Sequence, residues 1–201
     1  MSTSTPVAAD HERRQSGFGG LLPTSAVAGL SLGGYVALAL AARHPGRLRA
    51  LVLSNTRAEP DTPEAAEGRH ASAAQVRAEG PAPFLDGFVP RMVAPGADAA
   101  LREARAIADD QDPEGVARAL EALAGRADRR PDLHAMDVPA LVVAGAEDVL
   151  TPPALSEGLV AALPDARLHV VEGAGHLTVL ERPGEWVDVV RAFLAELDRS
   201  G

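Results

Sequence analysis

The sequence contains no cysteine, few aromatic residues and no long hydrophobic run. Without cysteine, neither a disulfide bond nor a thiolate metal site can form. Aromatic residues make up only 3% of the 201 residues, so a core has to be built mainly from Ala, Leu and Val. The most apolar stretch, residues 27–42, is shorter than the roughly 20 residues that a membrane-spanning helix needs. Residues 1–20 lack the apolar centre of a signal peptide. We therefore expect a soluble, cytoplasmic protein.

Basic residues are also in the minority. Asp and Glu number 28 against 19 Lys and Arg, which gives a formal net charge of −9. A nucleic-acid-binding surface would require a basic stripe. Five histidines are scattered without the spacing of metal ligands, namely His11, His44, His70, His134 and His169. These features predict no nucleic-acid or membrane partner, no metal site and no organic cofactor.

Strand and helix patterns alternate from residue 25 onward, after a leader at 1–24 that is rich in Ser, Thr, Gly and charge. The leader's composition predicts disorder or a foreign segment. Apolar runs predict strands at 26–30, 48–54, 140–144 and 166–171, and helical patterns fall at 32–44, 152–162 and 183–197, the second capped by Thr151. The strands are apolar throughout rather than alternating, which is typical of a parallel sheet covered on both faces.

A purely helical region interrupts this alternation between residues 57 and 130. Helical patterns occupy 62–79, 83–92, 97–110 and 113–126. Two of them begin with a capping side chain followed by proline, at Thr62 and Asp112, which is a helix-start signal. We interpret the region as a helical lid inserted into a core made of residues 25–56 and 131–201. Three lid residues are expected to line a substrate pocket: Phe84, Phe88 and Met92.

The segment Gly29-Leu30-Ser31-Leu32-Gly33 has the pattern Gly-x-Ser-x-Gly between a predicted strand and a predicted helix. This is the local sequence of a nucleophile elbow, a sharp turn that exposes a serine hydroxyl at the end of a sheet. Glycine at 29 and 33 is expected to avoid collisions at the turn. The following helix would direct the amide of Leu32 at a developing oxyanion. Ser31 is therefore a candidate nucleophile.

A serine nucleophile requires a base, and that base requires an acid that orients it. Asp148 follows the third predicted strand, and His176 follows the fourth. The carboxyl ends of parallel strands lie at one edge of a sheet, where Ser31, Asp148 and His176 can converge. Glu147, adjacent to Asp148, is the alternative acid.

Three segments resemble the α/β-hydrolase superfamily: VAGLSLGGYVALALAARHPGRLRALVLSNTRAEPDTP, VPALVVAGAEDVLTPP and VEGAGHLTVLERPGEW. The similarity is greatest to the lid-bearing branch with enol-lactone hydrolases, small-ester hydrolases and cofactor-free haloperoxidase-like proteins. The resemblance implies that Ser31 is the nucleophile, His176 the general base and Asp148 its orienting acid, with Leu32 as an oxyanion donor. It favours Asp148 over Glu147.

In that family about four strands precede the elbow strand, and a His-Gly loop supplies a second oxyanion amide. The residues before Ser31 offer no room for these strands and contain no His-Gly; the Gly-rich segment 17–21 is the nearest substitute. We therefore expect a truncated α/β-hydrolase of about four parallel strands, from the elbow strand onward, with an inserted helical lid. Its elbow strand would be an exposed edge that favours self-association. Three explanations stay open: a start further upstream, pairing with another copy or fragment, or a decayed hydrolase.

The pattern predicts a serine hydrolase acting on a small carboxylic ester or lactone through an acyl-enzyme, with activity impaired by the missing strands. One alternative is a catalytically silent, self-associating remnant that acts as an interaction protein. A peroxidase-type activity through a peracid formed on the same serine is another.

Overall fold

The computed structural model describes residues 25–200, which form an α/β fold around one parallel sheet. The strands stand in the order β1-β2-β3-β4, and each pairs in parallel with the next. Their bounds are Ser25–Leu30, Leu48–Ser54, Ala140–Gly145 and Ala166–Val171. The predicted α/β class with about four parallel strands is confirmed. The expected leader at 1–24 and the Gly-rich segment 17–21 lie outside the described residues.

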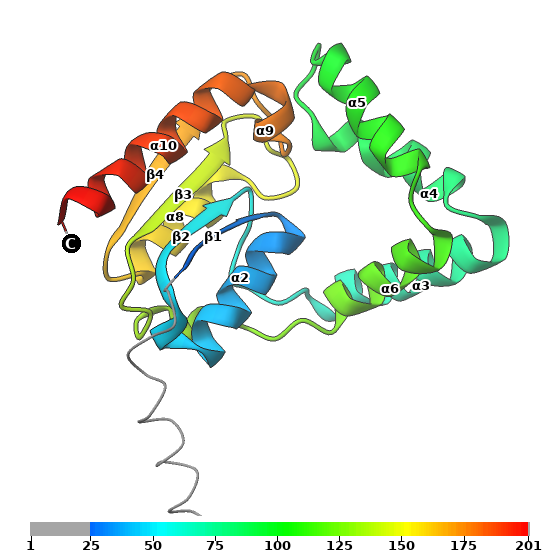
Figure 1. Cartoon of the computed structure of the whole chain (residues 1–201). Helices are drawn as coiled ribbons and strands as arrows, with labels where there is room; N and C mark the ends of the chain where they lie inside the picture. Colours follow the sequence, from blue (N-terminus) through cyan, green and yellow to red (C-terminus); the bar gives the residue numbers. More distant parts are fainter. Residues whose placement is uncertain (1–24, 201) are drawn as a thin grey trace, which may run out of the picture.

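Helices cover both faces of the sheet, which explains why the strands are apolar throughout. Along β2, Leu51 and Leu53 face one side, where they pack against α2, α7 and α8. Ala50 and Val52 face the other side and pack against α10. These helices are α2 (Leu32–Arg43), α7 (Arg130–Leu133), α8 (Pro153–Ala162) and α10 (Pro183–Ser200); the 3-10 helix η1 (Pro45–Arg47) follows α2. Figure 1 shows α10 lying across the strands on the side opposite α2.

Strand β1 is the edge of the sheet within the described residues, where its only partner is β2. Its first two residues and Ala28 are exposed, whereas Gly29 is buried. The carboxyl end of β1, which leads into the candidate elbow, is therefore the well-packed part of this strand.

Five helical elements, here called the helical insertion, follow β2 in the chain and precede α7 and the last two strands. Figure 1 shows them to one side of the sheet. They are α3 (Pro63–Glu79), α4 (Ala82–Phe88), η2 (Val89–Met92), α5 (Asp98–Asp109) and α6 (Pro113–Ala124). Both predicted helix starts are capped: Thr62 Oγ1 accepts from the Ala65 amide at 3.2 Å, and Asp112 Oδ2 from the Gly115 amide at 2.7 Å. The single helix expected at 83–92 is two elements, because η2 continues α4 with tighter 3-10 geometry.

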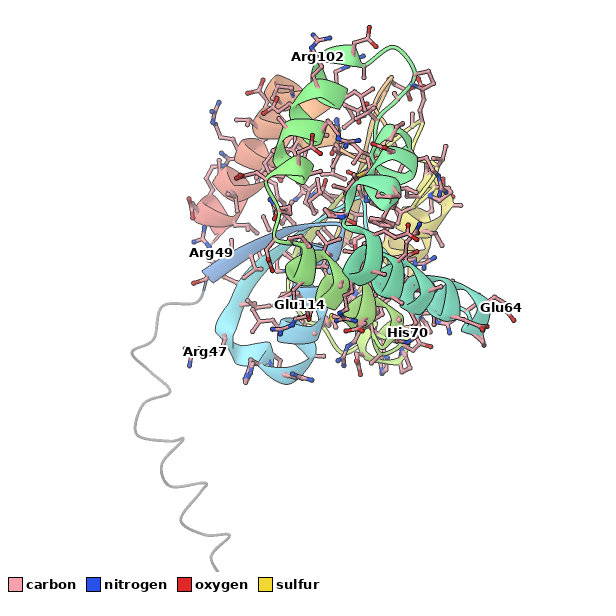
Figure 2. All side chains as sticks on the ribbon, turned by 90° about the vertical axis from the view of Figure 1, so that its right-hand side faces the viewer. Arg47, Arg49, Glu64, His70, Arg102 and Glu114 are labelled. Atoms are coloured by element: carbon pink, nitrogen blue, oxygen red, sulfur yellow. The ribbon has the colours of Figure 1, made fainter. Side chains whose placement is uncertain are left out.

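The insertion has small apolar clusters of its own and packs against the sheet domain through another. Helices α3 and α6 lie side by side and bury Ala73, Val76, Ala117 and Leu120. Further along, Leu85, Val89 and Ala104 pack against Leu177, which precedes the short helix α9 (Thr178–Glu181). Figure 2 shows Glu64, His70 and Arg102 projecting outward from α3 and α5. Within residues 25–200, no helix combines the length and apolarity that a membrane span requires.

Candidate active site

Ser31 forms the turn between β1 and α2, and its backbone has a positive φ of 49° with ψ −110°. A non-glycine residue there is strained and persists only when the surrounding structure holds it in place. The Ser31 amide donates to the Ser54 carbonyl oxygen at 2.9 Å. Its own carbonyl oxygen accepts from Thr56 Oγ1 and from the Gly34 amide, both at 2.9 Å. The end of β2 therefore fixes the strained turn.

Two glycines make this turn sterically possible, and one of them is not the expected one. A Cβ at Gly29 would lie 2.2 Å from the Gly33 carbonyl oxygen, and a Cβ at Gly34 would lie 2.5 Å from the Thr56 side chain. A Cβ at Gly33 would meet nothing within 4 Å. The prediction that position 29 requires glycine thus agrees with the structure, whereas the same prediction for position 33 was wrong. The helix N-terminus is open at position 33, whereas position 34 faces the residue that holds Ser31.

The loops after β3 and β4 bring Asp148 and His176 together. His176 Nδ1 lies 2.8 Å from Asp148 Oδ2, and both side chains are buried. Because the carboxylate can only accept, Nδ1 carries the hydrogen and Nε2 is left as the acceptor. Glu147 is exposed. Asp148, rather than Glu147, is the acid that contacts the histidine.

The Asp148 carboxylate is saturated with hydrogen bonds. Besides His176, Oδ2 accepts from Asn55 Nδ2 at 3.0 Å and from Thr151 Oγ1 at 2.6 Å. Oδ1 accepts from the amides of Leu150 and Thr151 at 2.8 and 2.9 Å. Burial raises the pKa of Asp148, but hydrogen bonds and charge from His176 and hydrogen bonds from Thr151 outweigh it and leave the pKa at about 2. Asp148 is therefore an anion at neutral pH.

Thr151 does not cap helix α8 as expected. The helix begins one residue later than predicted, after Pro152, without a side-chain cap. The Thr151 hydroxyl instead turns to Asp148 and lies 3.2 Å from His176 Nδ1. Pro152 occupies the cap position of α8, so Thr151 stands one residue too early to cap the helix, and its hydroxyl donates to the Asp148 carboxylate.

A second buried carboxylate, Glu181 of α9, fixes the loop that carries His176. It accepts from the amides of Gly175 and Leu177, on either side of His176, at 2.9 and 3.2 Å. It also accepts from the Ala94 amide at 2.7 Å. Because Ala94 follows η2, Glu181 links the histidine loop to the helical insertion.

Ser31 and His176 line one small cavity of about 110 Å³. No hydrogen bond joins their side chains among the described contacts, and such bonds are often long in unliganded sites. The other lining residues are Tyr35, Arg57, Arg69, Phe88, Leu123, Leu150 and Thr151. Of the three lid residues expected to line the pocket, Phe88 does so. Phe84 and Met92 pack into the apolar contacts of the insertion instead.

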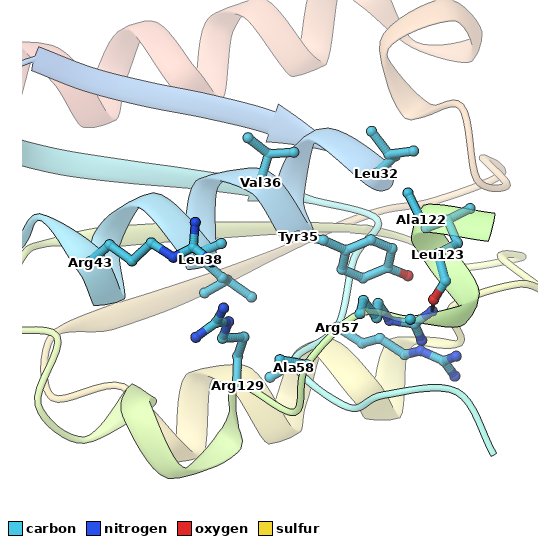
Figure 3. Close-up of a pocket in the computed structure, with 14 residues that line it drawn as sticks. Leu32, Tyr35, Val36, Leu38, Arg43, Arg57, Ala58, Ala122, Leu123 and Arg129 are labelled. Atoms are coloured by element: carbon cyan, nitrogen blue, oxygen red, sulfur yellow. Dashed lines mark hydrogen bonds between the residues drawn. The ribbon is translucent and has the colours of Figure 1, made fainter. Parts of the chain in front are cut away.

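A larger cavity of about 350 Å³ adjoins the small one and shares Tyr35, Arg57 and Leu123 with it. It lies between the exposed side of α2 and the end of α6 (Figure 3). Leu32, the first residue of α2, lines this cavity, and its amide has no carbonyl one turn earlier in the helix to bond. Together the two cavities offer room for a small organic ligand.

Sequence reasoning missed several residues that contact the site or line its cavity, among them the polar residues Asn55, Thr151, Arg57 and Arg69. Asn55 has a φ of 48°, which asparagine tolerates better than most residues, and it directly follows a strand. A polar residue at a strand end was therefore an available signal for Asn55. No pattern marks the two arginines. Among residues 25–200, no group of three potential metal-ligating side chains is found.

The Alpha/beta hydrolase family matches residues 3–189 of the chain. Among curated proteins, a pimeloyl-(acyl-carrier protein) methyl ester esterase from Neisseria meningitidis is 36% identical over 177 residues. That alignment covers 84% of this chain and 68% of the relative.

Two solved structures are also similar. A thermophilic esterase from Thermogutta terrifontis has 34% identity and a TM-score of 0.85, over 94% of this chain and 71% of the esterase. The enol-lactonase from Burkholderia xenovorans LB400 has 31% identity and a TM-score of 0.78, over 92% of this chain and 70% of the lactonase. The chain thus spans about 70% of the length of these proteins.

Proposed function

Because the chain belongs to the Alpha/beta hydrolase family, we propose that it hydrolyses a small carboxylic ester or lactone with Ser31, His176 and Asp148 as its catalytic residues. Similar proteins named as an esterase and an enol-lactonase support a carboxylic ester hydrolase. They do not favour a catalytically silent interaction protein. The observation that carries the assignment is the buried His176–Asp148 pair, whose histidine lines the same small cavity as Ser31 in its strained turn.

In the first half of the reaction, Ser31 Oγ attacks the carbonyl carbon of the ester while His176 Nε2 takes its proton. The Asp148 carboxylate accepts the Nδ1 hydrogen, which fixes the tautomer and stabilises the imidazolium that forms. When the tetrahedral intermediate collapses, the bond to the leaving oxygen breaks and His176 returns the proton to that oxygen. The products are an acyl-Ser31 and an alcohol, or an acyl-enzyme that retains the alcohol when the substrate is a lactone.

In the second half, water attacks the acyl-Ser31 carbonyl and His176 takes the proton from that water. Collapse of the second intermediate returns the proton to Ser31 Oγ and releases the carboxylic acid. The Leu32 amide at the start of α2 is the proposed donor to the oxyanion in both intermediates, supported by its unpaired position and the helix dipole.

The helical insertion is proposed to act as a lid over the site. Phe88 at the end of α4 and Leu123 at the end of α6 line the small cavity with Ser31. The acyl group of a bound substrate would therefore contact the insertion, while the ester bond that is cleaved lies at the sheet domain, next to Ser31. The core at 25–56 and 131–201 with a lid at 57–130 is the corresponding domain division.

Labelling with a fluorophosphonate, which reacts with activated serines, tests the assignment. We expect one adduct by intact mass on the wild-type protein and none on Ser31→Ala, because the reagent needs the activated hydroxyl. Hydrolysis of p-nitrophenyl acetate should be lost in the same variant. Ser156→Ala provides a matched control, since the Ser156 hydroxyl is buried in α8 and outside both cavities.

Absence of an adduct on folded wild-type protein, or an adduct that persists in Ser31→Ala, would contradict the proposed mechanism. Circular dichroism of each protein establishes folding before labelling. The acyl-enzyme is checked separately by rapid quenching during turnover, which should trap the acyl group on Ser31.

A further inference from the structure

Three arginines surround one buried carboxylate beside the candidate site. Asp61 has a side chain that is 1% exposed, and Arg57, Arg69 and Arg126 all contact it. Burial raises the pKa of Asp61, but hydrogen bonds and charge from Arg69 and Arg126 outweigh it, so the pKa is lowered. Arginine stays protonated in proteins. The cluster therefore carries three positive charges and one negative charge.

The excess positive charge faces the cavities. Arg57 and Arg69 line the small cavity with Ser31 and His176, and Arg57 also lines the larger one. No Asp or Glu is among the described residues that line either cavity, although the whole chain has a formal net charge of −9. A cavity lined by one sign of charge concentrates ligands of the opposite sign. In Figure 3, Arg57 lies beside Tyr35 and Leu123, the other two residues that both cavities share.

Hydrogen-bond donors of these arginines remain for a ligand. Asp61 takes one N–H from Arg57, through Nη2 at 2.7 Å, and one from Arg69, through Nε. Arg57 Nε is buried away from solvent, so the exposed 23% of the Arg57 side chain belongs to its other atoms. A guanidinium matches the two oxygens of a carboxylate. Arg126 has further partners besides Asp61, since it lies over the Tyr35 ring at 4.5 Å and donates to the Glu59 carbonyl oxygen.

We propose that Arg57 and Arg69 form a carboxylate-binding subsite, so that the preferred substrate is an ester or lactone with a free carboxylate near the bond that is cleaved. This inference rests on the proposed function, because it places the subsite next to Ser31. Asp61 holds both guanidinium groups in place and leaves part of their charge uncompensated. The substrate carboxylate would accept from the N–H groups of Arg57 and Arg69 that face the small cavity.

The test compares two esters that differ in one methyl group, monomethyl glutarate and dimethyl glutarate. The first carries a carboxylate where the second carries a neutral ester. We expect kcat/KM per ester group to be about tenfold or more higher for monomethyl glutarate, because a hydrogen bond to a charged group is stronger than one to a neutral group. A ratio of one or below in the wild-type protein overturns the proposal.

Arg57→Gln assigns the preference to the subsite. We expect the ratio of the two kcat/KM values to fall by about tenfold, and Arg57→Lys to restore part of it because the charge returns. Arg118→Gln, a substitution on the exposed side of α6, should leave the ratio unchanged. Circular dichroism confirms that each variant is folded. A ratio that Arg57→Gln does not change contradicts the subsite.

Binding of glutarate itself, by titration calorimetry, separates this proposal from the proposed function. Glutarate binding that Arg57→Gln weakens supports the subsite even if neither ester is hydrolysed, a result that would contradict the serine mechanism alone. Ester hydrolysis that requires Ser31 but shows no preference for the anion contradicts the subsite alone. No glutarate binding together with no anion preference overturns it.

Discussion

At the carboxyl end of the sheet two carboxylates, Asp148 and Glu181, are buried and hydrogen-bonded, whereas the ion pairs that join α3 to α6 on the helical insertion are exposed. Asp148 and Glu181 each accept hydrogen bonds from several loops. Arg77 of α3 contacts Glu114 and Glu121 of α6 on a surface open to solvent. A buried carboxylate loses much when one donor is removed, whereas an exposed ion pair loses little. The two regions therefore should respond very differently to the loss of a charge.

The largest effect is expected from removing the charge of Asp148. In Asp148→Asn the side chain is no longer an anion for His176 Nδ1–H, so the imidazole loses its fixed tautomer and the imidazolium its counter-charge. We expect kcat for ester hydrolysis to fall by about 10⁴-fold, as for a triad acid changed to its amide. Steady-state kinetics measures this, with the exposed Asp165→Asn as the control. A decrease of less than tenfold would rule out the orienting role.

Gly29→Ala is the next most damaging substitution, and it tests whether the strained turn depends on the sheet end. The new Cβ would lie 2.2 Å from the Gly33 carbonyl oxygen, a backbone atom that cannot rotate away. We expect a loss of about 3 kcal/mol in the free energy of unfolding, and a loss of activity because Ser31 would move. Gly33→Ala is the matched control, since its Cβ meets nothing within 4 Å. Urea unfolding should find Gly33→Ala at least as stable as the wild type, and equal losses in both variants would refute the steric argument.

Glu181→Gln probes the contact between the two regions. The amide group would direct a donor at the amides of Ala94, Gly175 or Leu177, so at least one hydrogen bond to a charged acceptor is lost. We expect the free energy of unfolding to fall by about 2–3 kcal/mol. Because the histidine loop is released, kcat should fall more than KM rises. Glu185→Gln, which removes a partly exposed contact with His169, serves as the control. Equal stability losses in the two variants would be evidence against a role of Glu181 in holding the histidine loop to the helical insertion.

A pH titration measures how strongly the contacts with His176 and Thr151 stabilise the ionised form of Asp148. Its pKa is about 2 in the folded protein and 3.8 in its ordinary state, so the unfolded chain binds the proton more readily. This stabilisation is fully present above pH 4 and is lost as the pH falls through about 2. The difference in unfolding free energy between the wild type and Asp148→Asn should therefore shrink by about 2 kcal/mol between pH 5 and pH 2. A pH-independent difference would contradict the lowered pKa.

The smallest effect is expected on the insertion. Arg77→Gln removes the contacts with Glu114 and Glu121, which join α3 to α6 at the surface. We expect a melting temperature only slightly below that of the wild type at low salt, and no difference in concentrated NaCl, because salt screens exposed charges. Thermal unfolding at both salt concentrations checks this. A large decrease in melting temperature that does not depend on salt would contradict this expectation, because it would show that these surface ion pairs contribute as much to stability as the buried carboxylates do.

Local patterns were sufficient for the strands, for the two helix starts at Thr62 and Asp112, and for the pairing of Asp148 with His176. β2 and β4 have the predicted bounds because an apolar run between polar residues is a local property of the chain. Asp148 and His176 could be found because parallel strands end at one edge. The fold class therefore followed from the sequence, and the candidate site followed in part.

The remaining features depend on contacts between residues far apart in the chain. Thr151 has the pattern of a helix cap, and only the position of Asp148 in the folded protein shows why its hydroxyl turns away from α8. Glu181 contacts Ala94 across 87 positions, and Arg126 reaches Asp61 from the opposite end of the insertion. No periodicity marks such partners, because each depends on how two loops meet.

The last residue of β2 and the two that follow it have a consequence for protein engineering. Ser54 and Thr56 hold the turn of Ser31, and Asn55, between them, holds the carboxylate of Asp148. One tripeptide is thus the common anchor of two loops that never follow one another in the chain. Grafting only the three candidate catalytic side chains onto another scaffold would transfer the reactive groups without the contacts that hold them in position. A functional transplant must carry Ser54, Asn55 and Thr56 along with Ser31, Asp148 and His176.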